Sequence, residues 1–385
     1  MTTYRVAILG CQSRGTFAAH AYHAHPRTTI VALCDLIPER LDMLGDKLSV
    51  ADRFTDLDKM IVETRPDIVA IPTATEFHYD LCMRVLEYGV NIDVEKPMCV
   101  DCEQADAVLA KAAEQDVKVA VHHQGRVSGL MRAVAKVLAD GGIGELRYIC
   151  GSGKGYYGGY GLMNIGTHMV NNLLKFLGRC RSVSAVAVTD GAPITPEHVV
   201  TSPHGMGIIA GEHITATLDF DNNVTANVLH HRFATVDSTQ YGIELYGTEG
   251  RLVWKTRGAW WLPQPCRVPH VRQNDWQRLN PISPPHYDPG SDANEMDYWF
   301  VEEFVRALDE GRDHECSGAE ARHAIEILMG IFESSMSGEM VTLPQEQRDH
   351  PLLRWRRVHG LSDPDPMPRL YDEWLAVEDQ RLGRV

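Results

Sequence analysis

NIDVEKPM, residues 91–98, ends a short apolar strand with two opposite charges and a proline. The apolar residues of this stretch alternate with polar ones, as expected of a strand with a buried face. Glu95 and Lys96 then follow, and Pro97 fixes its own φ and biases Lys96 toward an extended backbone. A lysine held at the end of a buried strand is a candidate for a functional residue.

Strands and helices alternate on both sides of this stretch. The expected strands are residues 3–10, 28–35, 65–73, 91–97 and 117–123, and the expected helices are 14–25, 38–48, 76–89 and 102–115. Strands that alternate with helices of this length pair in parallel through right-handed crossovers. Residues 1–123 are therefore predicted to form a doubly wound α/β domain of the Rossmann type, in which ligands bind at the carboxyl ends of the strands.

The second half of the chain has a different pattern. After residue 145, strand-like segments follow one another without helices between them, and GTEG, 247–250, is expected to turn between two of them. This order predicts an α+β domain over 124–345 with a large, mostly antiparallel sheet. Residues 346–385 form a proline-rich tail whose two tryptophans favour burial, so we expect it to pack on its own subunit or on a neighbour.

Composition limits the classes of partner. The chain has 385 residues, more than one hydrophobic core usually serves, and a formal charge of −15. That charge argues against nucleic acids and anionic membranes, and no apolar run reaches the roughly 20 residues of a membrane helix. The N-terminus enters a strand without a leader pattern, so we expect a cytoplasmic protein. Cys99 and Cys102 lack the companions that a zinc site needs, so no metal is expected.

The loop GCQSRG, 10–15, joins the first strand to the first helix. Gly10 and Gly15 match the first and last glycines of the dinucleotide fingerprint GxGxxG, while Gln12 replaces the middle one. The amides of Ser13, Arg14 and Gly15 could still bind a phosphate at the helix N-terminus. Two glycines would equally suit an ordinary strand–helix turn.

Asp35 ends the second strand, where an acidic residue would accept hydrogen bonds from the adenosine ribose. It would repel a 2′-phosphate, and the following Leu36 and Ile37 supply no cation, so the sequence favours NAD over NADP. The alternative is that Asp35 only caps the helix that begins near Pro38.

These motifs resemble the Gfo/Idh/MocA family, which includes glucose–fructose oxidoreductase and inositol dehydrogenase. The resemblance rests on GCQSRG, Asp35, IPT with His78, and above all EKP, and it extends over most of residues 1–345. It implies an NAD-dependent oxidoreductase whose second domain uses an open sheet for oligomer contacts. The cofactor-binding residues that follow are Gly10, Gln12, Ser13, Arg14, Gly15, Asp35, Pro72, Thr73, His78, Glu95, Lys96 and Gln124.

A second motif lies in GLMNIGTHMVNNLLKFLG, 161–178. The family pattern there is DxGxH, in which the acid and the histidine bind the substrate hydroxyl. His168 and Gly166 match this pattern, but Asn164 stands in place of the acid. The resemblance implies that His168 is the base and Lys96 its partner on the same oxygen, with Asn164 as a neutral positioning group. Without the family, His168 would be read as a structural histidine at a helix start.

Further residues are candidates for substrate contacts. KGYYGGY, 154–160, is rich in glycine and aromatic residues and suits either a mobile flap over a sugar or a loop that uses its tyrosines for packing. Arg126 and Lys154, with Arg232, would favour an anionic group on the substrate. The candidate substrate residues are Arg126, Lys154, Tyr156, Tyr157 and Asn171.

Three functions remain open at this point. The first is an NAD-dependent dehydrogenase of a sugar, polyol or sugar acid, working as a homo-oligomer. The second is a redox-neutral glycosidase, in which transient oxidation by bound NAD permits elimination, water addition and re-reduction; Asn164 keeps this alternative open. The third is a non-catalytic NAD-binding sensor, against which the presence of both Lys96 and His168 argues.

Overall fold

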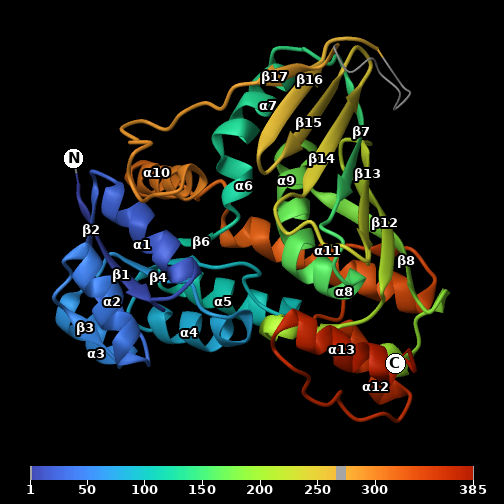
Figure 1. Ribbon diagram of the computed structural model, residues 1–385, viewed down its shortest axis with the longest axis horizontal. Coiled ribbons are helices and arrows are strands. Elements are labelled where there is room, and N and C mark those ends of the chain that lie inside the picture. The colour runs from blue at the N-terminus through green and yellow to red at the C-terminus, as the bar shows by residue number, and fades with distance from the viewer. Residues whose placement is uncertain (1, 266–274, 385) are drawn as a thin grey trace. The chain divides into compact units, whose positions relative to one another are not determined.

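The computed structural model describes residues 2–265 and 275–384, and the chain forms two compact units (Figure 1). The first unit contains the chain up to Cys99 with Gln104–Gly129 and Pro281–Ala321. The second contains Val100–Glu103, Leu130–Asn280 and the chain from Arg322 onward. No helix of the described residues has the length and apolar character needed to cross a membrane.

The first unit is built on a six-stranded parallel sheet in the order β3-β2-β1-β4-β5-β6. Its strands are β1 (Tyr4–Leu9), β2 (Thr28–Cys34), β3 (Arg53–Phe54), β4 (Ile68–Ile71), β5 (Asn91–Val94) and β6 (Val119–Val121). Its helices include α1 (Arg14–Ala24), α2 (Pro38–Leu48), α3 (Leu57–Thr64), α4 (His78–Leu86), α5 (Cys102–Glu114) and α6 (Gln124–Val127). This topology confirms the predicted Rossmann fold; the sequence pattern did not indicate β3, α3 or α6.

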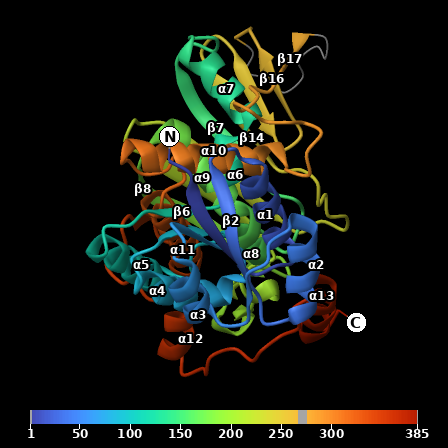
Figure 2. The same cartoon turned by 90° about the vertical axis from the view of Figure 1, so that its left-hand side faces the viewer.

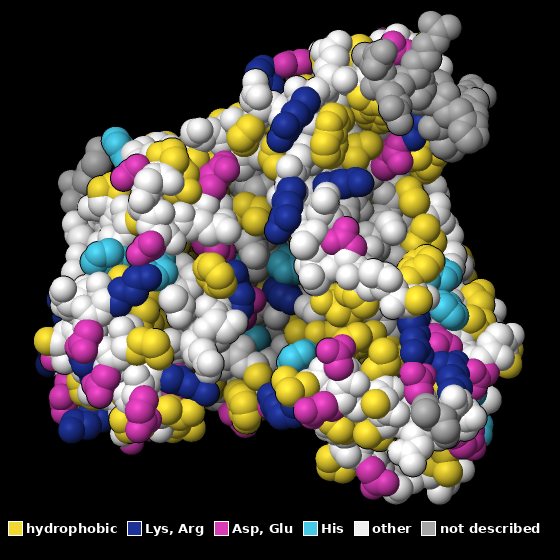
Figure 3. Space-filling model, viewed as in Figure 1, with side chains coloured by type: hydrophobic (Ala, Val, Ile, Leu, Met, Phe, Trp, Pro, Cys, Tyr) yellow, Lys and Arg dark blue, Asp and Glu magenta, His cyan; other side chains and the backbone are white. Residues whose placement is uncertain are grey.

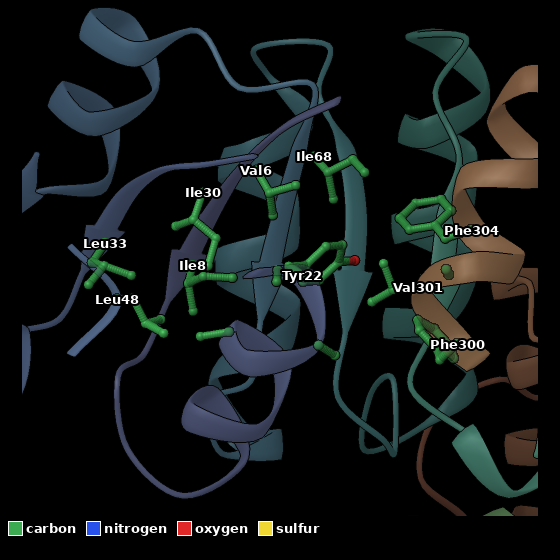
Figure 4. Close-up of a cluster of buried hydrophobic side chains, with 14 of the residues drawn as sticks. Val6, Ile8, Tyr22, Ile30, Leu33, Leu48, Ile68, Phe300, Val301 and Phe304 are labelled. Atoms are coloured by element: carbon green, nitrogen blue, oxygen red, sulfur yellow. The ribbon is translucent and has the colours of Figure 1, made fainter. Parts of the chain in front are cut away.

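Helix α10 (Glu295–Glu310) belongs to this unit, although the sequence placed it in the second domain. Its side chains Phe300, Val301 and Phe304 are buried in the same apolar cluster as Val6 and Ile8 of β1 (Figure 4). The expected boundary at residue 123 therefore misassigned this segment, because burial of the helix's apolar face on the first core outweighs its position in the sequence.

The second unit is built on a mixed sheet in the order β17-β16-β15-β14-β7-β13-β12-β8-β18, with β9 paired to β8. Its strands are β7 (Leu146–Ser152), β8 (Cys180–Thr189), β9 (Ala192–Pro193), β12 (His213–Phe220), β13 (Thr225–His231), β14 (Gly242–Gly247), β15 (Arg251–Lys255), β16 (Gly258–Leu262), β17 (Gln277–Leu279) and β18 (Val341–Thr342). A separate two-stranded sheet pairs β10 (Val200–Thr201) with β11 (Ile208–Ile209). The large sheet is antiparallel except where β13 pairs with β7, as predicted, and the amide of Gly247 closes the expected turn on the carbonyl of Gly250 at 2.9 Å.

One long helical run carries the second motif. It begins as α8 (Gly158–Gly161), passes through a π-helical stretch (Leu162–Gly166) and continues as α9 (Thr167–Leu177), which contacts β14. The other helices are α7 (Gly129–Ala139), α11 (Gly318–Ser337), α12 (Pro351–Val358) and α13 (Tyr371–Arg381) (Figure 2). The tail with α12 and α13 is part of the second unit.

Charged side chains of both signs are interspersed over the face of the molecule seen in Figure 3.

Candidate active site

The loop after β1 is shaped by its two glycines. Gly10 has φ of 110°, a conformation that side chains with a Cβ disfavour. A Cβ on Gly15 would lie 1.9 Å from the carbonyl oxygen of Gly10, so only glycine permits this approach of helix to strand. Gln12 and Ser13 are exposed beside the start of α1. A tight turn that leads into a helix N-terminus in this way fits the pyrophosphate of a dinucleotide.

Asp35 lies directly after β2 and is nearly buried. Its carboxylate accepts the amide of Cys11 at 2.8 Å and the amide of Ile37 at 3.0 Å, so it fixes the glycine loop and also the entry to α2. The Arg40 guanidinium lies 3.8 Å from the same carboxylate. Leu36 and Ile37, directly after Asp35, supply no cation; Arg40 supplies one a helical turn later, and it is paired with Asp35.

His78 joins the loops that follow β4 and β5, at the carboxyl edge of the parallel sheet. Its ring nitrogens contact the carbonyl oxygens of Pro97 at 2.8 Å and Thr73 at 3.1 Å, and the side chain is fully buried. Both ring nitrogens of His78, which the sequence predicts to bind the cofactor, are therefore occupied by the loops after β4 and β5. The Thr73 hydroxyl is buried without a hydrogen-bond partner among the described residues, as expected of a group that awaits a polar ligand.

Lys96 lies two residues after the end of β5, beside a buried ion-pair cluster. The Glu95 carboxylate accepts the Lys96 amide at 3.1 Å and the Arg14 guanidinium at 2.5 Å, and Arg14 also bonds Asp297 of α10 at 2.8 Å. Burial alone would raise the pKa of Glu95, but Arg14, His122 and Lys96 outweigh it and lower the pKa to about 2. The side chain of Arg14 thus holds the end of β5, in addition to any role of its backbone at a phosphate.

His122, which follows β6, completes this cluster. Its ring nitrogens contact Asp93 of β5 at 3.1 Å and Asp297 at 3.0 Å. Burial opposes its charge, yet the two carboxylates outweigh burial and raise the pKa of His122 to about 10. The end of β5, the start of α1, the end of β6 and α10 are therefore tied together by paired charges.

The residues after His122 border the same edge. His123 is buried. Burial is the main cause that lowers its pKa to about 3, and the nearby charges of Lys96 and Arg126 add to it, so the imidazole is neutral. Gln124 opens α6 and is half-buried, which is compatible with its predicted cofactor contact. Arg126 is nearly buried and donates to Glu320 at 2.8 Å.

The second unit presents His168 on α9 and Asn164 in the π-helical stretch before it. His168 is 7% exposed, and its ring lies 5.7 Å from the ring of Tyr241, between centroids. The Asn164 amide donates to the Tyr160 hydroxyl at 2.9 Å. π-helical insertions in α-helices often mark functional sites. Tyr160 ends the KGYYGGY stretch, whose candidate residues are Tyr156 and Tyr157, and Tyr241 carries no sequence signal.

Tyr241 also lines a pocket of about 430 Å³ with Lys154, Asp237, Gln240 and Phe233. The Lys154 ammonium donates to the carbonyl of Ser238 at 2.7 Å and lies 5.8 Å from the Tyr241 ring centroid. The predicted substrate residue Lys154 therefore borders a cavity large enough for a small polar molecule.

Other predicted substrate residues lie elsewhere. Tyr157, a predicted substrate residue, has no exposed surface, and its hydroxyl donates to Glu378 at 3.2 Å, so the structure assigns its side chain a packing role. Of the two alternatives for residues 154–160, a flap or a packing loop, the structure is closer to the second: the stretch is helical from Gly158, and its glycines pack on neighbouring backbone. Arg232 is paired with Glu212 and Asp379. Tyr156 is half-buried, and Asn171 is fully buried in α9.

Two family models match the chain. Residues 4–123 match the oxidoreductase family with an NAD-binding Rossmann fold, GFO_IDH_MocA, and residues 154–343 match the C-terminal alpha/beta domain of the same oxidoreductase family. Together they span most of the chain, so the first unit is an NAD-binding domain.

Individual relatives agree with this match. The chain is 24% identical over 356 residues to D-apiose dehydrogenase of Rhizobium rhizogenes, covering 89% of this chain and 98% of that protein. It is 27% identical over 190 residues to D-glucoside 3-dehydrogenase of Escherichia coli, covering 45% and 54%. The fold is similar to that of levoglucosan dehydrogenase in complex with NADH and levoglucosan, with a TM-score of 0.72 at 18% identity over 89% of this chain and all of that one.

The pairing of Asp35 with Arg40 predicts a change in cofactor preference. Asp35→Ser removes the acceptor for the ribose diol and frees Arg40 for a 2′-phosphate, so NADH binding should weaken roughly tenfold and NADPH binding should strengthen. Fluorescence titration with both cofactors measures this change. The double variant Asp35→Ser/Arg40→Ala should lose the gain for NADPH; an undiminished gain would mean that Arg40 is not the cation involved.

The buried cluster predicts how stability depends on pH. The lowered pKa of Glu95 stabilises the folded chain above pH about 4.5, and this is lost as the pH falls toward about 2. The raised pKa of His122 stabilises it below pH about 6.5, and this is lost as the pH rises through about 10. Urea denaturation at a series of pH values from 3 to 10 should therefore show that these two residues contribute most to the free energy of unfolding between about pH 4.5 and 6.5.

Asp297→Asn should lower the free energy of unfolding near pH 6 by about 3–5 kcal/mol, because Arg14 and His122 lose a buried partner. It should also flatten the fall in stability above pH 6.5. The exposed Asp292, which pairs with Lys47, provides the control Asp292→Asn, which should change stability little. Equal effects of both variants would contradict the assignment of the cluster.

Proposed function

Because the chain belongs to the Gfo/Idh/MocA family of oxidoreductases, we propose that it is an NAD-dependent dehydrogenase of a sugar, polyol or sugar acid. The observation that carries this proposal is the fixed position of Lys96 at the carboxyl edge of the Rossmann sheet. The names of the relatives, which act on D-apiose and D-glucosides, support a carbohydrate substrate.

The chemistry is the oxidation of a secondary alcohol. Bound NAD supplies a nicotinamide ring that takes up the hydride from the carbinol carbon. His168 accepts the hydroxyl proton, and the Lys96 ammonium stabilises the negative charge that develops on the oxygen. Asn164 holds the substrate by hydrogen bonds without adding charge, since an amide offers both donors and an acceptor.

A redox-neutral glycosidase remains the second candidate, and Asn164 is the observation that favours it. The family pattern has an acid at this position, and its replacement by a neutral amide removes one negative charge from the substrate side. In such an enzyme the same hydroxyl is oxidised only transiently, the resulting ketone acidifies the neighbouring C–H, and a glycosidic substituent leaves by elimination. Water then adds, and the hydride returns to carbon.

We also propose that the protein is a homo-oligomer that associates through the open face of the large sheet. Tyr148 and Tyr246 stack on each other there, and Tyr148 and Val186 are exposed. Exposed aromatic and aliphatic side chains of this kind are enriched at interfaces. Light scattering coupled to gel filtration should give a dimer or a tetramer.

Loss of either proposed catalytic side chain should abolish turnover. Lys96→Ala and His168→Ala should each lower kcat/KM by roughly a hundredfold or more, because each removes a group that acts on the reacting proton or charge. Absorbance of NADH during incubation with NAD and a panel of sugars, polyols and sugar acids measures this. Lys118→Ala and His213→Ala, with side chains paired elsewhere, serve as matched controls. Turnover near wild type in both catalytic variants would refute the assignment.

The products distinguish the two candidate functions. A dehydrogenase should accumulate NADH with free sugars, whereas a glycosidase should release the aglycone from nitrophenyl glycosides without net NADH. Loss of aglycone release in Lys96→Ala would assign that activity to the same site. Tight NAD binding with neither product across the panel would favour a non-catalytic sensor.

A further inference from the structure

We propose that Tyr371, the first residue of α13, is a positioning residue that supports Asn164 through Tyr160 and so takes part in substrate binding. The catalytic consequence rests on the proposed function, whereas the structural support does not. Tyr371 lies in the tail, beyond residue 343, where the match to the family's C-terminal domain ends. The support is therefore a feature of this chain outside the part that defines the family.

Helix α13 is fixed to the second unit by buried polar contacts. Trp374 has no exposed surface, and its indole nitrogen donates to the carbonyl of Thr201 at 2.7 Å. Glu378 is also fully buried; it accepts the Tyr157 hydroxyl at 3.2 Å and is paired with Arg381. Because Trp374 and Glu378 are both buried and hydrogen-bonded, α13 is held in one position on the second unit.

Charged pairs fix α13 to the same segment that anchors the start of α8. Asp379 accepts both terminal nitrogens of Arg232, at 2.6 and 2.7 Å. The Glu212 carboxylate binds Arg384 at 2.6 and 2.7 Å, while the backbone carbonyl of Glu212 accepts the amide of Gly158 at 2.8 Å. Glu212 therefore holds both the tail, through its carboxylate, and the first turn of α8, through its backbone carbonyl.

Tyr371 carries this support to the helical run. Its hydroxyl accepts the amide of Tyr157 at 2.8 Å, just before α8. Its ring stacks on Tyr160, with centroids 5.1 Å apart, and meets the edge of Tyr156 at 4.9 Å. In Figure 1, α13 lies beside α8, as these contacts require.

Tyr160 then contacts the residue that departs from the family pattern. Its hydroxyl accepts the Asn164 amide at 2.9 Å, and burial raises the pKa of Tyr160, so the hydroxyl keeps its proton. Tyr160, Asn164 and His168 follow one another at intervals of four residues along the same helical run. A change in the position of Tyr160 would therefore be transmitted to the amide that we assign to substrate positioning.

Hydrogen exchange measured by mass spectrometry tests the support without any substrate. Tyr371→Ala should raise exchange in peptides that cover residues 156–168, while Tyr371→Phe, which keeps the ring, should restore most of the protection. Val377→Ala, on an exposed face of the same helix, is the matched control and should leave exchange unchanged. Unchanged exchange in Tyr371→Ala would overturn the proposal, whatever the enzyme's reaction.

Kinetics then test the catalytic consequence, with the panel sugar that shows the highest turnover. Tyr160→Phe removes only the hydroxyl that bonds Asn164, and it should lower kcat/KM for the sugar about five- to tenfold while leaving NADH affinity unchanged. Tyr371→Ala should do the same, with partial recovery in Tyr371→Phe. If exchange rises but kcat/KM is unaffected, the tail is only structural and the role in substrate binding is refuted. If no sugar is oxidised, the proposed function fails, and the exchange data alone decide whether Tyr371 supports the helical run that carries Asn164.

Discussion

Opposite charges buried together hold the end of β5, and the first unit's part of the candidate site depends on them. Glu95 and Asp297 are anions that share the Arg14 guanidinium, and Asp297 shares His122 with Asp93. Removing such groups from water costs several kcal/mol each, so each charge must find a partner in a fixed geometry. That requirement fixes the backbone from which Lys96 extends and links it to the loop that carries the glycines.

Local chemistry explains why much of this unit could be predicted from the sequence. A strand that ends in a charge and a proline, a glycine that tolerates positive φ, and an acid at the end of β2 all carry their constraints within a few residues. The alternation of strands and helices then predicted a parallel sheet, because helices that connect neighbouring strands do so by right-handed crossovers. The predicted residues Gly10, Asp35 and Lys96 consequently lie at the same edge of the sheet in the structure.

Long-range partners could not be predicted in the same way. Asp297 is 283 positions from Arg14, and a single carboxylate in an amphipathic helix is indistinguishable from a solvated one in the sequence. Tyr157 illustrates the same difficulty: its neighbours suit either a mobile flap or a packed loop, and the partner that decides its burial, Glu378, lies 221 positions away. Such assignments require the tertiary fold, because burial decides which polar groups are structural.

In the proposed reaction, Asn164 changes what the second unit contributes. An acid at this position would add a negative charge and could only accept hydrogen bonds when ionised, whereas the amide donates to Tyr160 and leaves the local charge unchanged. A buried neutral pair needs no counter-ion, but it depends on geometry, because hydrogen bonds weaken steeply with angle and distance. Replacing charge by geometry explains why a rigid support, such as the one α13 provides, would be useful at this position.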